Sequence, residues 1–195
     1  MLFRSKTSVN LRAPFILTKV FLETMKSQRR GSIINIASLS SEKGFVAEIA
    51  YCPSKFGLEG LTQCLALELK PYGIAVNSLN VSTPPGKMLK PTGLTLAELE
   101  KMPKETREQY ADDDMLVEAF TDAWVFLALQ DASGVTGQRF RTMELAEYLK
   151  QNGWEAAVAK WRGKLTKAVY VSYDFPKSVR YQTLGGGWKE LTFEN

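Results

Sequence analysis

The chain has 195 residues, of which 45% are hydrophobic and 24% are charged, and it contains two cysteines and no histidine. This length suits one globular domain with a sizeable core, and the composition excludes a globally disordered chain. The absence of histidine excludes Ser-His-Asp catalysis, Cys-His catalysis and His-ligated metal sites, and two cysteines cannot form a multi-cysteine metal site. We therefore expect no metal.

The net charge of +4 belongs to residues 150–195, which hold eight basic and four acidic side chains. We interpret this stretch as a solvated, locally folded surface and expect no nucleic-acid partner. Apolar stretches such as residues 124–129 are far shorter than a membrane span, and the N-terminus lacks the apolar run of a secretory signal. If Cys52 and Cys64 share one helix, their spacing keeps them apart as free thiols, which fits a reducing compartment. These features predict a cytoplasmic protein without a membrane partner.

The first half of the chain predicts alternating helices and strands. Apolar side chains at helical spacing predict a helix over Val9–Met25, and a β-branched run predicts a buried strand over Ser32–Ala37. A loop over Ser38–Ala47 leads to a second helix over Ala50–Leu69, and a second buried strand follows over Ile74–Leu79. A strand, a long helix and a further strand form a βαβ unit, so we expect a parallel sheet.

The second half begins with an irregular segment, in which the capping-box pattern from Thr95 predicts a short helix. A third long helix is expected over Met115–Leu129, followed by a turn and a short strand within Gly134–Phe140. The remaining elements are helices over Glu144–Asn152 and Trp154–Arg162, each ended by a glycine, and strands over Ala168–Tyr173, Val179–Leu184 and Trp188–Phe193. Gly185–Gly187 is expected to join the last two strands as a hairpin. We place a boundary between a main body, residues 1–142, and a C-terminal extension, residues 143–195.

Tyr51 and Lys55 stand at the start of the second predicted helix and offer acid–base chemistry to a protein without histidine. Positions i and i+4 share one face of a helix. A tyrosine is a poor base because its reference pKa is about 10, but a nearby ammonium or a helix N-terminus favours the phenolate form. The pair alone is weak evidence, because Tyr173 and Lys177 repeat the same spacing.

Two further residues distinguish the first pair. Ser38 lies 13 residues before Tyr51 at the end of a predicted strand, and Asn10 lies 28 residues before Ser38 on the first helix. With Lys55, these spacings resemble the Asn-Ser-Tyr-Lys tetrad of the short-chain dehydrogenases/reductases. The surrounding sequence also resembles that family, with VNL at 9–11, GSIINIAS at 31–38, AYCPSKFG at 50–57, GIAVN at 73–77 and VTGQ at 135–138.

The resemblance covers about residues 7–140 and implies an α/β fold with a three-layer, Rossmann-like parallel sheet. It implies that Tyr51 acts as general acid in reduction and as base in oxidation, while Lys55 assists Tyr51 and hydrogen-bonds the nicotinamide ribose. Ser38 would hold the substrate oxygen where charge develops, and Asn10 would hold a water that links Lys55 to solvent. The expected activity interconverts a secondary alcohol and a ketone with NADP or NAD as cofactor.

The sequence departs from the family pattern at the cofactor-binding half. It lacks the Gly-rich TGxxxGxG turn and the NNAG motif, so the expected fold is truncated to its C-terminal strands and helices, with an α+β extension. The family's PG aligns with Val81 and Ser82, so these two residues and Thr83 are the candidates for contacts with the nicotinamide carboxamide. The truncation is also expected to leave one edge and much of the apolar face of the strand over Ser32–Ala37 uncovered.

The alternative to an enzyme is a catalytically inactive fragment that acts through association. In the family, the helices equivalent to Val9–Met25 and Ala50–Leu69 commonly build the dimer interface. The resemblance therefore implies a homo-oligomer or a pair with a full-length relative.

Overall fold

The computed structural model describes residues 2–81, 87, 96–110, 113–167, 176–182 and 188–193. The helices are α1 (Leu2–Thr7), a π-helical turn (Ser8–Arg12), α2 (Ala13–Gln28), α3 (Tyr51–Leu69), α4 (Leu96–Glu100), α5 (Lys104–Arg107), α6 (Asp113–Ala128) and α7 (Thr142–Trp161), with single 3-10 turns at Leu39–Ser41 and Lys70–Tyr72. The strands are β1 (Gly31–Ala37), β2 (Ile74–Asn80), β3 (Arg139–Arg141), β4 (Ser178–Gln182) and β5 (Trp188–Thr192).

The main sheet is parallel, as the βαβ pattern predicts, and its strand order is β1-β2-β3. β1 pairs with β2 along its whole length, from Gly31 opposite Ile74 to Ala37 opposite Asn80. β3 adds a short third strand, with Arg139 opposite Ser78. The predicted short strand near Gly134–Phe140 is therefore confirmed, although it begins at Arg139 and ends at Arg141.

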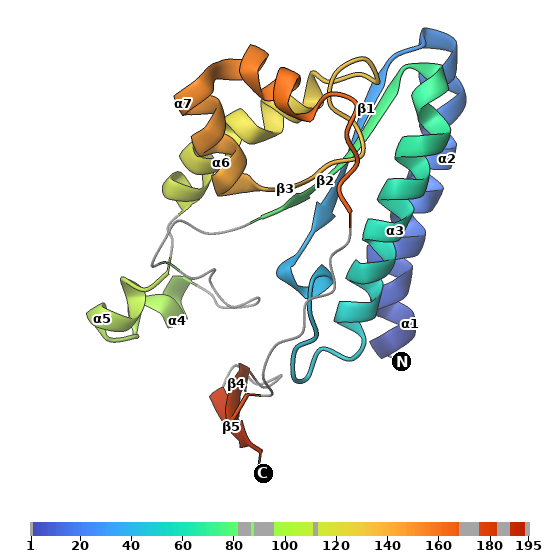
Figure 1. Ribbon diagram of the computed structural model, residues 1–195. Helices are drawn as coiled ribbons and strands as arrows, with labels where there is room; N and C mark the ends of the chain where they lie inside the picture. The colour runs from blue at the N-terminus through green and yellow to red at the C-terminus, as the bar shows by residue number, and fades with distance from the viewer. Residues whose placement is uncertain are drawn as a thin grey trace.

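Helices cover both faces of the sheet, so that the chain forms three layers: α2 and α3 lie on one side, and α6 and α7 lie on the other (Figure 1). The alternation of side chains along β2 explains this arrangement. Ile74 and Val76 pack in a cluster with Leu65 and Leu69 of α3, whereas Leu79 packs in a second cluster with α6 and α7. The α/β architecture expected from the sequence is confirmed.

The second cluster is the larger core and draws on the extension as well as on the main body. Phe126 and Leu127 of α6 are fully buried there, and Leu145 and Leu149 of α7 pack against them. Fully burying one such side chain stabilises the fold by roughly 1.5–3 kcal/mol. Helix α7 therefore belongs energetically to the same core as the sheet, although it begins at the predicted boundary.

The elements of the extension that the structure describes come in the predicted order. Helix α7 has a non-helical residue at Gly153, with φ 79° and ψ 170°, so the predicted break between two helices is confirmed. β4 and β5 pair in the antiparallel manner of the predicted hairpin. The predicted turn at Gly185–Gly187 and the predicted strand over Ala168–Tyr173 lie outside the described residues.

One edge of the sheet and one helix face are uncovered. Among the described residues β1 pairs with β2 alone, so its outer edge has no strand partner there, as the sequence predicts. Next to that edge, α2 exposes more than half of the side chains of Phe15, Leu17, Val20 and Phe21. Within the described part of the chain, no helix has the length and apolar character needed to cross a membrane.

Candidate active site

The start of α3 sets the distance between Tyr51 and Lys55. The backbone N–H groups of Tyr51 and Cys52 both donate to the carbonyl of Glu48, at 2.9 Å each, and this turn leads into the helix. One helical turn later, Lys55 Nζ lies 5.6 Å from the centroid of the Tyr51 ring. A second ammonium, Lys6 Nζ of α1, lies at the same distance from that ring. The phenol of Tyr51 therefore lies close to two positive charges.

Lys55 is a buried cation, with 8% of its surface exposed. Its Nζ donates a hydrogen bond of 2.7 Å to the carbonyl of Ile36, near the end of β1. Burial lowers the pKa of Lys55 below its ordinary value of 10.5, and the negative charge of Glu59, one turn further along α3, partly opposes that change. An ammonium has three N–H donors, and the bond to Ile36 uses one of them.

Ser38 follows β1 directly and begins a tight turn. Its Oγ accepts a hydrogen bond of 3.2 Å from the N–H of Ser40 and so caps the 3-10 turn Leu39–Ser41. Its carbonyl accepts bonds from the N–H of Ser41 at 3.0 Å, from Ser41 Oγ at 2.6 Å and from Arg139 Nη2 at 3.0 Å. The backbone at Ser38 is therefore fixed from several directions.

Asn10 lies in the π-helical turn between α1 and α2, a type of helix defect that is frequent at functional sites. Its Nδ2 donates to Ser54 Oγ at 3.0 Å, and Ser54 Oγ in turn donates to the carbonyl of Tyr51 at 2.6 Å. A chain of two hydrogen bonds thus connects Asn10 to the backbone of Tyr51. The water expected between Asn10 and Lys55 stays a prediction.

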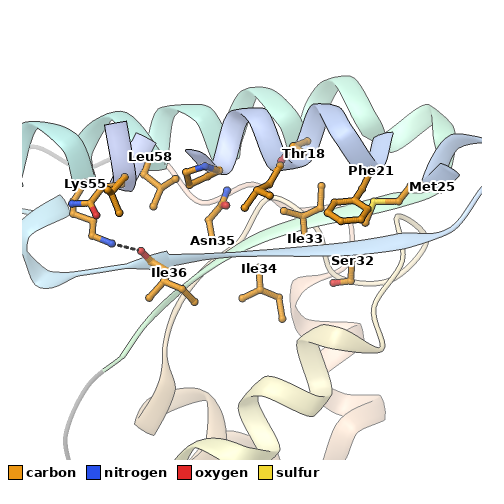
Figure 2. A pocket seen from close by; sticks show the side chains of 14 residues that line it. Thr18, Phe21, Met25, Ser32, Ile33, Ile34, Asn35, Ile36, Lys55 and Leu58 are labelled. Atoms are coloured by element: carbon orange, nitrogen blue, oxygen red, sulfur yellow. Dashed lines mark hydrogen bonds between the residues drawn. The ribbon is translucent and has the colours of Figure 1, made fainter. Parts of the chain in front are cut away.

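A groove of about 410 Å³ runs between α2 and the outer edge of β1 (Figure 2). Asn10 and Lys55 line it together with mostly apolar side chains of α2 and β1, whereas Tyr51 and Ser38 are not among its lining residues. In Figure 2 the ammonium of Lys55 points along the groove toward the carbonyl of Ile36. The groove therefore connects the expected proton-relay residues with the uncovered edge of the sheet.

The remaining predicted cofactor contacts lie after β2. Val81 is half-buried directly beyond the end of that strand. Ser82 and Thr83 lie outside the described residues, so their contacts stay predictions. No three Cys, Asp or Glu side chains of the described residues gather in a way that could hold a metal ion.

Two charged residues at the site were missed by sequence reasoning, namely Glu59 and Arg139. Glu59 accepts hydrogen bonds from Ser78 Oγ at 2.7 Å and from Arg139 Nε at 2.9 Å. Its position four residues after Lys55 on one helix face was a usable signal. Arg139 gave no such signal, because it reaches the site from a strand about 100 residues after Ser38.

Comparisons with known proteins show what the chain is similar to. The family model of the short chain dehydrogenases matches residues 2–95. An uncharacterized oxidoreductase of Bacillus subtilis, YxjF, is 35% identical over 143 residues, which are 70% of this chain and 56% of that protein. The 3-oxoacyl-(acyl-carrier-protein) reductase FabG of Rickettsia bellii is 34% identical over 136 residues, which are 70% of this chain and 54% of that protein.

Solved structures give the same result. A protein of Beutenbergia cavernae assigned as an NAD(P)-dependent gluconate 5-dehydrogenase, with NADP bound at low occupancy, superposes with a TM-score of 0.53 at 27% identity. The match covers 76% of this chain and 57% of that one, and the chain spans about half the length of the curated relatives it matches. The similarities in sequence and in fold support membership of the chain in the short-chain dehydrogenase/reductase family.

Proposed function

We propose that the chain carries the proton-transfer half of an NAD(P)-dependent oxidoreductase that interconverts a secondary alcohol and a ketone. The observation that carries this proposal is the placement of Tyr51 beside the buried ammonium of Lys55, next to the end of β1, where Ser38 stands. A phenol near a positive charge can give and take a proton at a substrate oxygen. The oxidoreductase names of the relatives support the same reaction class.

Each residue has a role that its surroundings support. In reduction, the Tyr51 hydroxyl gives its proton to the carbonyl oxygen, and Lys55 stabilises the phenolate that remains. Ser38 supplies a hydroxyl to the oxygen on which negative charge develops. Asn10 holds the Tyr51 backbone through Ser54 and lines the groove from which a proton can return through solvent. When bound, a nicotinamide cofactor supplies or accepts the hydride.

The residues present fit the nicotinamide end of such a cofactor and not its phosphates. Two donors of the Lys55 ammonium are left for a ribose hydroxyl, among the hydrogen bonds of the described residues. The sequence offers no Gly-rich turn between a strand and a helix to bind a pyrophosphate. The solved relative with NADP supports an NAD(P) cofactor, with the choice between NADP and NAD left open. Val81, Ser82 and Thr83 stay the proposed contacts of the carboxamide.

A second candidate function is association without catalysis, with another copy of the chain or with a full-length relative. The exposed apolar side chains of α2 and the free edge of β1 favour it, because such surfaces mark interaction sites in soluble proteins. The cytoplasmic location and the division of the chain at residue 142 are likewise proposals that accompany both functions.

Titration of the purified chain with NADPH and with NADH, followed by cofactor fluorescence, tests the first candidate. We expect saturable micromolar binding that Lys55→Ala weakens at least tenfold. Lys177→Ala is the matched control, because Lys177 belongs to the second Tyr-x-x-x-Lys pair and is exposed. Tyr51→Phe should bind cofactor and lose turnover. A folded, monodisperse sample that binds neither cofactor would contradict the enzymatic proposal, and its mass by light scattering would then test association.

A further inference from the structure

Arg139 joins three segments of the chain at the candidate site. From β3 its guanidinium donates to Glu59 of α3 at 2.9 Å through Nε, and to Glu42 through Nη1. Through Nη2 it donates to the carbonyl of Ser38 at 3.0 Å and to Ser41 Oγ at 3.3 Å. One side chain therefore ties the end of β1 and the turn after it to the helix that carries Tyr51 and Lys55.

The cluster around Arg139 is partly shielded from solvent, and both its side chains and its backbone are hydrogen-bonded. The side chains of Arg139 and Glu59 are 18% and 15% exposed, so their hydrogen bonds are partly protected from water and from screening by salt. A guanidinium presents its donors in a rigid planar fork, which an ammonium cannot replace. The backbone is held as well, since the N–H of Arg139 donates to Thr166 Oγ1 at 2.9 Å and the N–H of Thr166 donates to the carbonyl of Gly137 at 2.9 Å.

The further partners of Glu42 and Glu59 explain why Arg139 can also hydrogen-bond a neutral carbonyl. Glu42 is shared with Arg141, whose Nη2 lies 2.9 Å from its second oxygen, and Glu59 is shared with Ser78. Each carboxylate thus has a second partner that fixes it in place. The Nη2 group of Arg139 is left pointing at the Ser38 turn, where it meets the carbonyl directly.

We propose that Arg139 is a positioning residue for Ser38, and this inference rests on the proposed oxidoreductase function. The carbonyl that Arg139 holds belongs to the same residue whose hydroxyl is expected to face the substrate oxygen. Rotation of that peptide would move the N–H of Ser40, which donates to Ser38 Oγ, and would so release the hydroxyl from its position. Loss of the guanidinium should therefore misplace the hydroxyl while the pair Tyr51 and Lys55, fixed within α3, stays in place.

The test compares Arg139→Met with Arg141→Met, which removes the same charge from the same strand but not a contact with Ser38. The first readout is amide hydrogen exchange by NMR. We expect Arg139→Met to speed exchange at Ser40 and Ser41 at least tenfold and Arg141→Met to change it less than threefold. The amide of Val76, which donates to Thr136 Oγ1 in the sheet, serves as the internal reference for global stability.

The second readout is steady-state kinetics with NADPH and acetoacetyl-CoA as probe. Arg139→Met should lower kcat at least tenfold with little change in the KM for NADPH. The kcat of Arg139→Lys should lie closer to that of Arg139→Met than to that of the wild type. Equal exchange at Ser40 in the two methionine variants would overturn the positioning role, whether or not the wild type turns over the probe. A wild type that neither binds nor reduces, together with the expected exchange, would instead overturn the proposed function alone.

Discussion

The buried amide of Asn77 should be one of the most sensitive positions for stability. Asn77 is fully buried in β2, where its Nδ2 donates to the carbonyl of Val135 at 2.9 Å and its Oδ1 accepts from the N–H of Gln138 at 3.0 Å. Asn77→Ala would leave one buried acceptor and one buried donor without partners, at a cost of about 1–3 kcal/mol each. We therefore expect a loss of about 2–6 kcal/mol, a large share of the roughly 5–15 kcal/mol that holds a domain folded.

Urea unfolding followed by circular dichroism measures this loss. The control is Gln151→Ala on α7, because its hydrogen bond to Glu147 is exposed and its removal should change the free energy of unfolding by about 0.5 kcal/mol or less. A loss below about 1 kcal/mol in Asn77→Ala would refute the reasoning.

Four further predictions concern charge, backbone conformation and thiol reactivity. Burial raises the pKa of Glu42, but the hydrogen bonds and charges of the two arginines of β3 outweigh burial and hold this pKa below 4.5. The stabilisation from Glu42 is therefore present above pH 4.5 and is lost as the pH falls through the pKa of the folded state. Glu42→Gln should flatten the fall of the unfolding free energy with decreasing pH, and the same slope in the variant and the wild type would contradict this. Gly73 has φ +78° and its Cβ would lie 2.1 Å from the Arg29 carbonyl, so Gly73→Ala should destabilise by more than about 1 kcal/mol in urea unfolding. Gly60→Ala, in open space on α3, should instead stabilise by about 0.5–1 kcal/mol. The exposed thiol of Cys64 should react with iodoacetamide before the buried cysteine does, as peptide mass spectrometry would reveal.

The sequence was informative wherever the contact is local or the pattern is periodic. The helical spacing of apolar residues and the β-branched runs predict the βαβ unit. Apolar residues that recur at the period of a helix or a strand lie on the one face of that element that is buried. The spacing of Tyr51 and Lys55 predicts their proximity for the same reason, since one turn of helix separates them. Ser38 is expected near them from the resemblance of its spacing to the family tetrad, and the structure places it directly after β1.

The charged cluster could not be predicted in this way. Arg139 meets Ser38 and Glu42 across about 100 residues, and its register depends on how β3 pairs with Ser78 of β2. Three residues of strand carry too little pattern to set that register from sequence. The contribution of Thr166 was hidden for a similar reason, because it lies in the extension and reaches back to the backbone of Arg139 after the whole of α7.

The uncovered edge of β1 connects the two candidate functions physically. Lys55 donates to the carbonyl of Ile36 in that edge strand and lines the groove beside it. A segment that pairs with β1 would cover the groove and remove more water from the ammonium, and burial already lowers the pKa of Lys55. Association at this edge would therefore lower the pKa of Lys55 further, and it would act on the same lysine that is proposed to bind the cofactor. Cofactor titrations should for that reason be made on samples whose mass is known, at protein concentrations on both sides of any association midpoint.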